Sequence, residues 1–345
     1  MKICQVVAGF GQGGLEKHVR ELTQQLVHAG HEVTVFGDRR FLSTLPTHAS
    51  TVAVRFHLNR HHPLLLLELL VKLRACDCDI IHAQANKAAS MIALLKPWLS
   101  CPTLGTLHNI KRDVRAFHKL DHLIAVSQQL AQPFPSDQVS VIYNGIDTPE
   151  VASIDLRTAY ALPADLPVLC AVGRLVPAKG FDVLLDAIDG MPVSLLIAGE
   201  GVERVVLQQR IDRLSPITHA RLLGHQTNAA ALMASSDGVV IASRREGFSY
   251  VCIEALLSGT RILSTDVPVA NEILPADLIV PGDNPIALRE KLVTLLGDMA
   301  RWNSLMLAPR QFAQASVSLH NMGERTLALY AALRQLPAGR IRNAH

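Results

Sequence analysis

The chain has 345 residues, of which 49% are hydrophobic and 18% charged, and this composition excludes a largely disordered protein. The length is comfortable for two domains. Residues 1–145 contain 15 Lys and Arg against 10 Asp and Glu, together with 11 of the 15 histidines, so the first part of the chain is basic and suited to an anionic partner.

Short apolar stretches alternate with amphipathic helical patterns along the whole chain, which predicts parallel sheets covered by helices on both faces. Strands are predicted at 2–8, 32–37, 51–56, 79–83, 103–107, 122–126 and 139–143, and after a linker at 147–167 again at 167–172, 193–198, 220–224, 238–242, 261–265 and 278–280. Helices are predicted at 15–29, 64–75, 87–96, 111–119 and 127–132, then at 180–189, 202–214, 228–235, 250–258, 269–274, 284–297, 300–314 and 321–335. The fold class is therefore α/β, with two doubly wound Rossmann-like domains facing each other across a cleft. The last helix is long enough to cross back onto the first domain.

The first predicted strand runs into a glycine-rich turn, in which Gly9, Gly11 and Gly14 form a G-x-G-x-x-G pattern. Such a turn brings backbone N–H groups to a phosphate at a helix N-terminus. With Asp38 about 20 residues further on, the pattern fits an NAD-dependent oxidoreductase. Any other phosphate ligand fits the glycines equally well.

In the second half, Gly173-Arg174 ends an apolar strand, and Lys179 follows five residues later, just before a helix. A planar guanidinium and a compact ammonium at the carboxyl end of a strand suit a diphosphate. The alternative is a pair of surface cations flanking a turn.

A second anion-binding pattern follows the strand predicted at 238–242. Glu246, Gly247 and Phe248 form a turn, after which Ser249 is placed to cap a helix that begins at Tyr250. The free N–H groups of residues 249–251 would point at an anion, and Glu254 lies on the first turns of the same helix. Two carboxylates beside an anion site suit hydroxyl groups of a sugar and a ribose, although Glu254 could also be a solvated helix residue.

His108 ends the strand predicted at 103–107, so it is aimed at the same cleft. A lone histidine is more often a packing or surface residue, and its position at a strand end favours a role in the site.

These elements occur in one order along the chain: Gly13-Gly14, His108, Asn144-Gly145, Gly173-Arg174 with Lys179-Gly180, Gly199-Glu200-Gly201, Gly224, and Glu246-Gly247-Phe248 with Glu254. The chain resembles the GT-B fold retaining glycosyltransferases of family four, the glycosyl transferases group 1. The resemblance implies an acceptor-side domain over 1–147, a nucleotide-sugar domain over 148–320, and a C-terminal helix and tail over 321–345.

The resemblance also implies roles for individual residues. Arg174 and Lys179 would neutralise the diphosphate of a nucleotide-sugar, and Glu254 would bind the ribose. The nucleotide expected from the family is UDP. Glu246 and the donor-binding residues Gly173, Gly247, Phe248, Ser249 and Tyr250 would hold the rest of the donor, with Gly13 and Gly14 approaching from the first domain and His108 beside the transferring sugar. Such a site implies front-face transfer with retention and without a metal or other cofactor.

One loop departs from the family pattern, since Val267 to Glu272 reads Val-Pro-Val-Ala-Asn-Glu where many relatives carry a Gly-Gly pair. This departure leaves the identity of the sugar open. A catalytically inactive sugar-nucleotide-binding protein of the same fold is a further alternative.

The basic surface of the first half predicts a phosphorylated or lipid-linked glycan acceptor, such as a lipopolysaccharide core, and contact with an anionic membrane. Its clusters are Arg39-Arg40, then Arg55, Arg60, His61 and His62, then Lys111, Arg112, Arg115, His118 and Lys119. The alternative is an ordinary solvated surface that happens to be basic. Nucleic acid is not expected as a partner, because only 4% of residues are aromatic and no basic run is interleaved with aromatics. The six scattered cysteines and the short apolar segments predict a cytoplasmic protein without a membrane-spanning segment.

Overall fold

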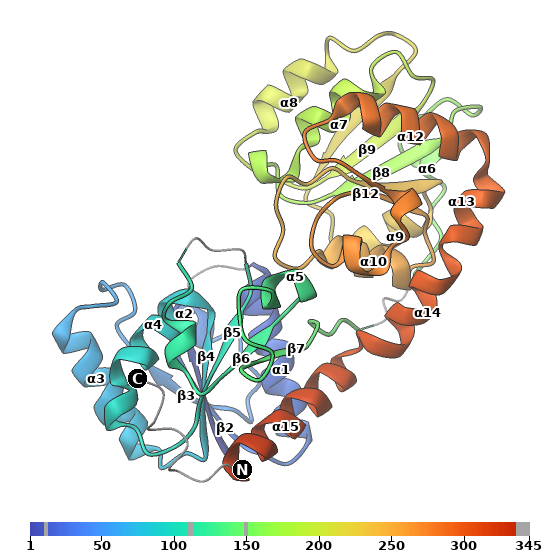
Figure 1. The fold of residues 1–345 in the computed structure, drawn as a ribbon. Helices are drawn as coiled ribbons and strands as arrows, with labels where there is room; N and C mark the ends of the chain where they lie inside the picture. The colour runs from blue at the N-terminus through green and yellow to red at the C-terminus, as the bar shows by residue number, and fades with distance from the viewer. Residues whose placement is uncertain (10–12, 110–112, 148–150, 336–345) are drawn as a thin grey trace. The chain divides into compact units, whose positions relative to one another are not determined.

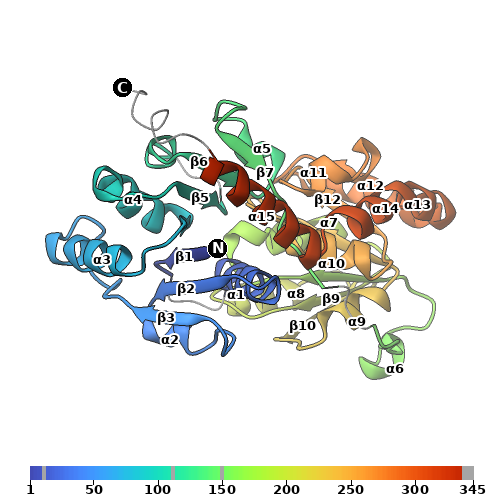
Figure 2. The ribbon, with the colours of Figure 1, turned by 90° about the horizontal axis from the view of Figure 1, so that it is seen from below.

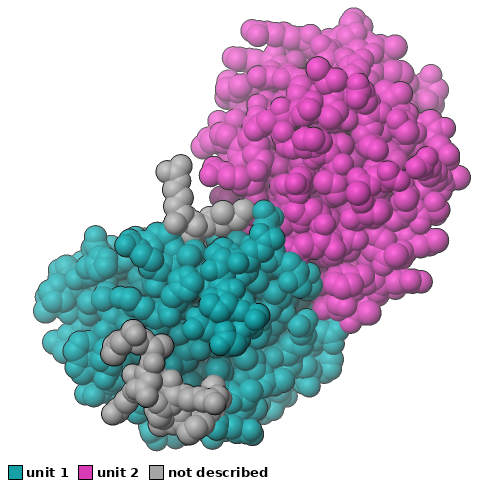
Figure 3. Space-filling model, in the orientation of Figure 1, with its two compact units in different colours: residues 1–145, 318–345 teal, residues 146–317 magenta. Residues whose placement is uncertain are grey.

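The computed structural model describes residues 1–9, 13–109, 113–147 and 151–335. The chain divides into two compact units, which Figure 3 shows in different colours. Unit 1 comprises Met1–Gly145 with the chain from Ser318 onward, and unit 2 comprises Ile146–Val317. These divisions lie two and three residues before the predicted boundaries at 147 and 320.

Unit 1 is built on a parallel seven-stranded sheet in the order β3-β2-β1-β4-β5-β6-β7 (Figure 1). Its strands are β1 (Lys2–Val7), β2 (Glu32–Gly37), β3 (Ser50–Ala53), β4 (Ile80–Gln84), β5 (Thr103–Leu107), β6 (His122–Ala125) and β7 (Val139–Val141). Its helices are α1 (Gly14–His28), α2 (Arg39–Leu42), α3 (Pro63–Ala75), α4 (Ala85–Leu95), α5 (Gln128–Ala131) and α15 (Leu319–Gln335), with 3-10 turns η1 (Lys96–Trp98) and η2 (Phe117–Lys119). The central strands are buried along their whole length, as expected for a parallel sheet covered on both faces.

Unit 2 is built on a parallel six-stranded sheet in the order β10-β9-β8-β11-β12-β13. Its strands are β8 (Val168–Val172), β9 (Ser194–Ala198), β10 (His219–Gly224), β11 (Gly238–Ile241), β12 (Ile262–Thr265) and β13 (Ile279–Val280). Its helices are α6 (Leu156–Ala159), α7 (Phe181–Ile188), α8 (Arg204–Ile211), α9 (Ala229–Ala234), α10 (Tyr250–Leu257), α11 (Ala270–Ile273), α12 (Pro285–Gly297), α13 (Met299–Leu305) and α14 (Leu307–Ser316), with 3-10 turns η3 (Pro177–Lys179) and η4 (Ala276–Leu278). Two sheets of this topology confirm the predicted pair of doubly wound Rossmann-like domains.

The C-terminal helix α15 returns to unit 1, where it packs against α1 (Figure 2). Its Tyr330 is fully buried in the core of that unit. Gly145 is required at this crossing, because a Cβ there would lie 2.5 Å from the Cα of Leu319. The Asn144-Gly145 element of the sequence therefore has a packing role.

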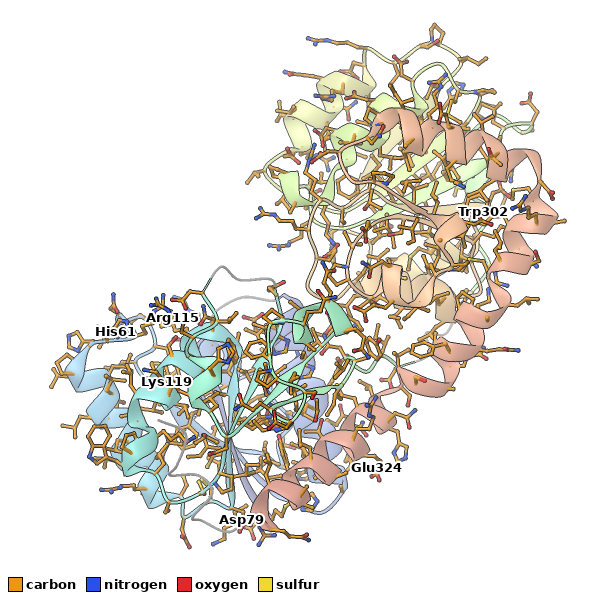
Figure 4. All side chains as sticks on the ribbon, viewed as in Figure 1. His61, Asp79, Arg115, Lys119, Trp302 and Glu324 are labelled. Carbon is orange, nitrogen blue, oxygen red and sulfur yellow. The ribbon has the colours of Figure 1, made fainter. Side chains whose placement is uncertain are left out.

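In unit 2, the indole of Trp302, which Figure 4 labels on α13, fills the core beside β11 and β12. Its N–H donates to the carbonyl of Ile262 at 3.1 Å, and a Cβ at Gly238 would come within 2.4 Å of the ring. Helix α13, which follows β12 in the chain, thus covers the sheet at β11 and β12.

Three predicted segments were wrong in detail. The helix predicted at 111–119 is reduced to the 3-10 turn η2, and residues 113–116 are not helical. The carboxylate of Asp113 instead accepts a hydrogen bond from the backbone N–H of Arg115 in a turn. Residues 110–112 lie outside the described part of the chain. The helix predicted at 300–314 is split into α13 and α14, since the ring of Pro309 is incompatible with a helical carbonyl at Leu305. The predicted linker contains α6, whose N-cap is Asp155.

Candidate active site

The loop after β8 in unit 2 is held tightly against the end of β11. Gly180 has a φ of 63°, and a Cβ there would lie 2.1 Å from the carbonyl oxygen of Ala242. Gly173 packs against the side chain of Lys179, since a Cβ at Gly173 would be 3.1 Å from Lys179 Cε. The glycines therefore let the lysine fold back over the carboxyl end of its own strand.

Lys179 and Glu246, predicted separately from the sequence, form an ion pair in which the ammonium donates to Glu246 Oε1. Ser243 Oγ donates to the same oxygen at 2.8 Å. The two charged side chains are only 20% and 12% exposed, which weakens screening by water. They lie at the carboxyl ends of β8 and β11, where the strand order of the sheet reverses and where such folds bind ligands.

Arg244 holds the loop after β11 in place, and its role was not predicted from the sequence. Its guanidinium makes two hydrogen bonds of 2.8 Å to the carboxylate of Asp182 on α7, and it also pairs with Asp283. The hydrogen bond from Arg244 lowers the pKa of Asp182, so that carboxylate stays ionised. The sequence does show an acidic residue, Asp182, on the first turn of α7. Its partner Arg244 could not be identified, because it is 62 residues away in sequence.

Arg174 lies on the other side of the same loop. Gly173 and Arg174 line a pocket of about 280 Å³ with Gly199 and Glu200 after β9 and His225 and Gln226 after β10. Arg174 itself is exposed. The loop thus carries one cation in the pocket and a second, Lys179, beside Glu246.

The N-terminus of α10 forms the third part of this region. The helix begins at Tyr250 as predicted, but Ser249 makes no capping hydrogen bond: its hydroxyl is buried and without a partner. Gly247 and Phe248 are buried in the turn, and the rings of Phe248 and Tyr250 stack edge to face at 5.0 Å. A buried hydroxyl without a partner at a helix N-terminus suits a bound anion. Glu254 is half-buried on the following turn of α10.

The loop that departs from the family pattern keeps an unusual backbone. Val269, fully buried, has φ 74° and ψ −51°, a strained conformation that glycine adopts more readily. The loop therefore retains the shape that a glycine would allow while presenting an apolar side chain.

In unit 1, His108 follows β5 and is 7% exposed. Its Nε2–H donates to Gln84 Oε1 at 3.0 Å, Gln84 Nε2 donates to Gln5 Oε1 at 3.0 Å, and Gln5 Nε2 donates to Thr23 Oγ1 at 2.9 Å. This chain of donors orients the imidazole and leaves Nδ1 as the acceptor. Burial, with the nearby His18 and His82, holds the pKa of His108 well below its ordinary value, so the ring is neutral.

The glycine-rich turn after β1 is occupied by a carboxylate. Glu16 is buried and accepts the backbone N–H of Gly13 at 3.1 Å, and Gly14 is the first residue of α1. Asp38, which an NAD site would use for the ribose, instead caps α2 through the backbone N–H of Arg40 at 3.0 Å. Gly11 lies outside the described residues. The described part of this turn thus offers little to a dinucleotide.

None of the helices described here combines the length and apolarity needed to cross a bilayer. Within the same residues, no three or more His, Cys, Asp or Glu side chains are grouped to hold a metal ion.

Two family models match consecutive parts of the chain: Glycosyltransferase Family 4 over residues 12–150 and Glycosyl transferases group 1 over residues 153–305. The lipopolysaccharide core biosynthesis glycosyltransferase LpsE of Rhizobium meliloti is 28% identical, over 74% of this chain and 77% of its own. The phosphatidyl-myo-inositol mannosyltransferase of Mycolicibacterium smegmatis is 28% identical, over 83% of this chain and 82% of its own.

Among solved structures, Anabaena Alr3699/HepE in complex with UDP has a TM-score of 0.82 at 22% identity, over 96% of this chain and 100% of that one. A glycosyltransferase from Rickettsia africae ESF-5 has a TM-score of 0.83 at 20% identity, over 97% and 99% of the two chains. These similarities show that the two sheets form the GT-B fold.

Proposed function

Because the chain belongs to the group 1 glycosyltransferases of family 4, we propose that it moves a hexose or N-acetylhexosamine from a UDP-sugar to a glycan acceptor with retention of configuration. The observation that carries the proposal is the cluster of Lys179, Glu246 and Ser243, together with the unpartnered hydroxyl of Ser249 at the start of the helix that follows Glu246. The ammonium of Lys179 and the N-terminus of α10 both follow the carboxyl ends of strands, and both attract the negative charge of a sugar diphosphate.

In this proposal, the bond between the anomeric carbon and the diphosphate oxygen breaks while the acceptor oxygen bonds to the same face of the sugar. The leaving phosphate takes the acceptor proton, so no side-chain nucleophile takes part. Lys179 and Arg174 stabilise the charge that develops on the diphosphate. Glu254 accepts hydrogen bonds from the ribose hydroxyls, and Glu246 and the turn at Gly247 hold the donor sugar.

The acceptor is proposed to be a lipopolysaccharide core or another envelope oligosaccharide, because the relative LpsE is a lipopolysaccharide core biosynthesis glycosyltransferase. The protein then works at the cytoplasmic face of a membrane. Leu64, Leu67 and Val71 support this placement, because they form an exposed apolar stripe on α3 of the basic unit 1. We propose peripheral contact with an anionic membrane through this stripe.

The test is to incubate the protein with a panel of nucleotide-sugars and to follow donor turnover by mass spectrometry, with and without EDTA. We expect a UDP-sugar to be hydrolysed or transferred in both conditions. Binding of UDP without turnover of any sugar would favour an inactive sugar-nucleotide-binding protein. Loss of turnover in EDTA and recovery with manganese would overturn the metal-independent mechanism. A thermal shift with NAD and none with UDP would favour the oxidoreductase.

A further inference from the structure

Unit 1 contains a cavity of its own, in addition to the pocket beside Arg174 in unit 2. None of the residues proposed to bind the sugar donor lines it. It has a volume of about 710 Å³ and lies at the carboxyl ends of β1, β4 and β5. The strand order of this sheet reverses between β1 and β4, so the cavity occupies the position where doubly wound sheets bind ligands. Its polar lining comes from His57, Asn59, Arg60, Gln84, Asn86, Lys87 and Asn109.

Two cations meet on one side of this cavity. Lys87 is half-buried on the first turn of α4, where its ammonium donates to the carbonyl of Phe56. Arg60 donates to Ser90 Oγ, one turn further along the same helix, at 3.3 Å. Both side chains line the cavity, and burial, followed by the charge of Arg60, lowers the pKa of Lys87. An anion between them would relieve this repulsion.

The nearby carboxylate of Asp113 is already engaged by Arg115, which contacts both of its oxygens at 3.0 and 2.8 Å. Asp113 therefore does not neutralise the two cations fully.

The start of α4 adds to this positive site. Its N-cap residue Gln84 makes no capping hydrogen bond, because its side chain is turned toward Gln5 and His108. Ala85, the first residue of the helix, has a φ of 64°, a left-handed conformation that is strained in a residue other than glycine. Strain of this kind clusters at ligand sites, and here it shapes the wall of the cavity.

We propose that this cavity binds a phosphate group carried by the acceptor, held between Arg60, Lys87 and the N-terminus of α4. Two cations match the charge of a phosphate monoester, and the amides of Asn59, Asn86 and Asn109 suit the hydroxyl groups next to it. The proposal rests on the glycosyltransferase function, which it deepens by naming the class of acceptor. The phosphate belongs either to a lipid headgroup or to a soluble phosphorylated sugar.

The experiment compares matched ligands by calorimetry on the full-length protein. Glucose 6-phosphate is paired with glucose, and dioctanoyl phosphatidic acid with dioctanoylglycerol. We expect at least a tenfold preference for the phosphorylated member of one pair, and that pair identifies the source of the phosphate. The preference should be lost in Arg60→Gln/Lys87→Gln and kept in Arg39→Gln, which alters an exposed arginine on α2 outside the cavity.

Equal affinities within both pairs would overturn the proposal, as would an unchanged preference in the double variant. Arg60→Lys keeps the charge and should keep most of the preference, which guards against a variant that fails to fold. Turnover of UDP-sugars by the wild-type protein is measured separately. A phosphate preference without any turnover would retain the site and reject the glycosyltransferase function.

Discussion

Lys179 and Glu246 form an ion pair across the carboxyl ends of β8 and β11, and Ser243 donates to the carboxylate oxygen that the lysine contacts. The pair is held in place by glycines that bring the two loops together and by Arg244, which ties the loop after β11 to Asp182 on α7. The ammonium is therefore positioned before a donor arrives. Charge placed in advance is the main way in which an enzyme stabilises a transition state electrostatically.

Lys179→Ala should lower turnover by about 10²–10³-fold with a smaller change in the KM for the donor, because it removes a cation from the developing diphosphate charge. Arg174→Ala should act in the same direction. Steady-state kinetics of UDP-sugar turnover measure both effects, with Lys291→Ala on α12 as the matched control. Full turnover of Lys179→Ala at saturating donor would contradict the proposed role.

Glu254→Ala should mainly weaken donor binding. A hydrogen bond to a charged group contributes about 1.5–3 kcal/mol, which corresponds to about a 10–150-fold loss of UDP affinity. Calorimetric titration with UDP gives the affinity directly. Glu290→Ala removes an exposed carboxylate from α12 of the same unit and should bind UDP as the wild type does. If both variants bind UDP equally well, Glu254 does not contact the nucleotide.

The sequence predicted the strands well because parallel strands buried on both faces read as continuous apolar runs, as Val168–Val172 does. It placed Lys179 and Glu246 after the carboxyl ends of two strands for the same reason, whereas the structure shows that these strands are neighbours. It did not predict their ion pair, nor the role of Arg244, because the partners of these residues are 67 and 62 residues away. It also assigned Ser249 a capping hydrogen bond that the structure lacks, since propensity does not report where a side chain turns.

Unit 1 should lose stability in mild acid because of three buried histidines. Burial lowers the pKa of His18 to about 4 and that of His82 to about 3, and His108 is lowered too. The unfolded chain takes up these protons at about pH 6.5, whereas the folded unit does not. The free energy of unfolding therefore keeps its full value above pH 6.5. It falls by about 1.4 kcal/mol per pH unit for each histidine as the pH drops from 6.5 toward 4.

Hydrogen exchange followed by mass spectrometry measures this loss in peptides of β4 and β5, between pH 8 and pH 5. His18→Gln should flatten the pH dependence by about one proton, because it removes one of the three buried histidines and leaves the other two. His219→Asn changes an exposed histidine of unit 2 and should leave the dependence as it is. A pH dependence that His18→Gln does not alter would mean that this histidine is not linked to folding.

The apolar stripe on α3 should bind anionic vesicles. Leu64, Leu67 and Val71 are 56%, 58% and 59% exposed and recur at helical spacing, so they face one side of the helix. Leu64→Ser/Leu67→Ser should lower binding to phosphatidylglycerol vesicles by tenfold or more, because each leucine contributes about 1.5–3 kcal/mol when fully buried. Added salt should weaken the binding of the wild type, since unit 1 is basic.

Ile286→Ser/Val293→Ser removes two similarly exposed apolar side chains from α12 of unit 2, at 69% and 56%, and should sediment with vesicles as the wild type does. Equal sedimentation of the α3 variant and the wild type would show that the membrane, if the protein binds one, is contacted elsewhere.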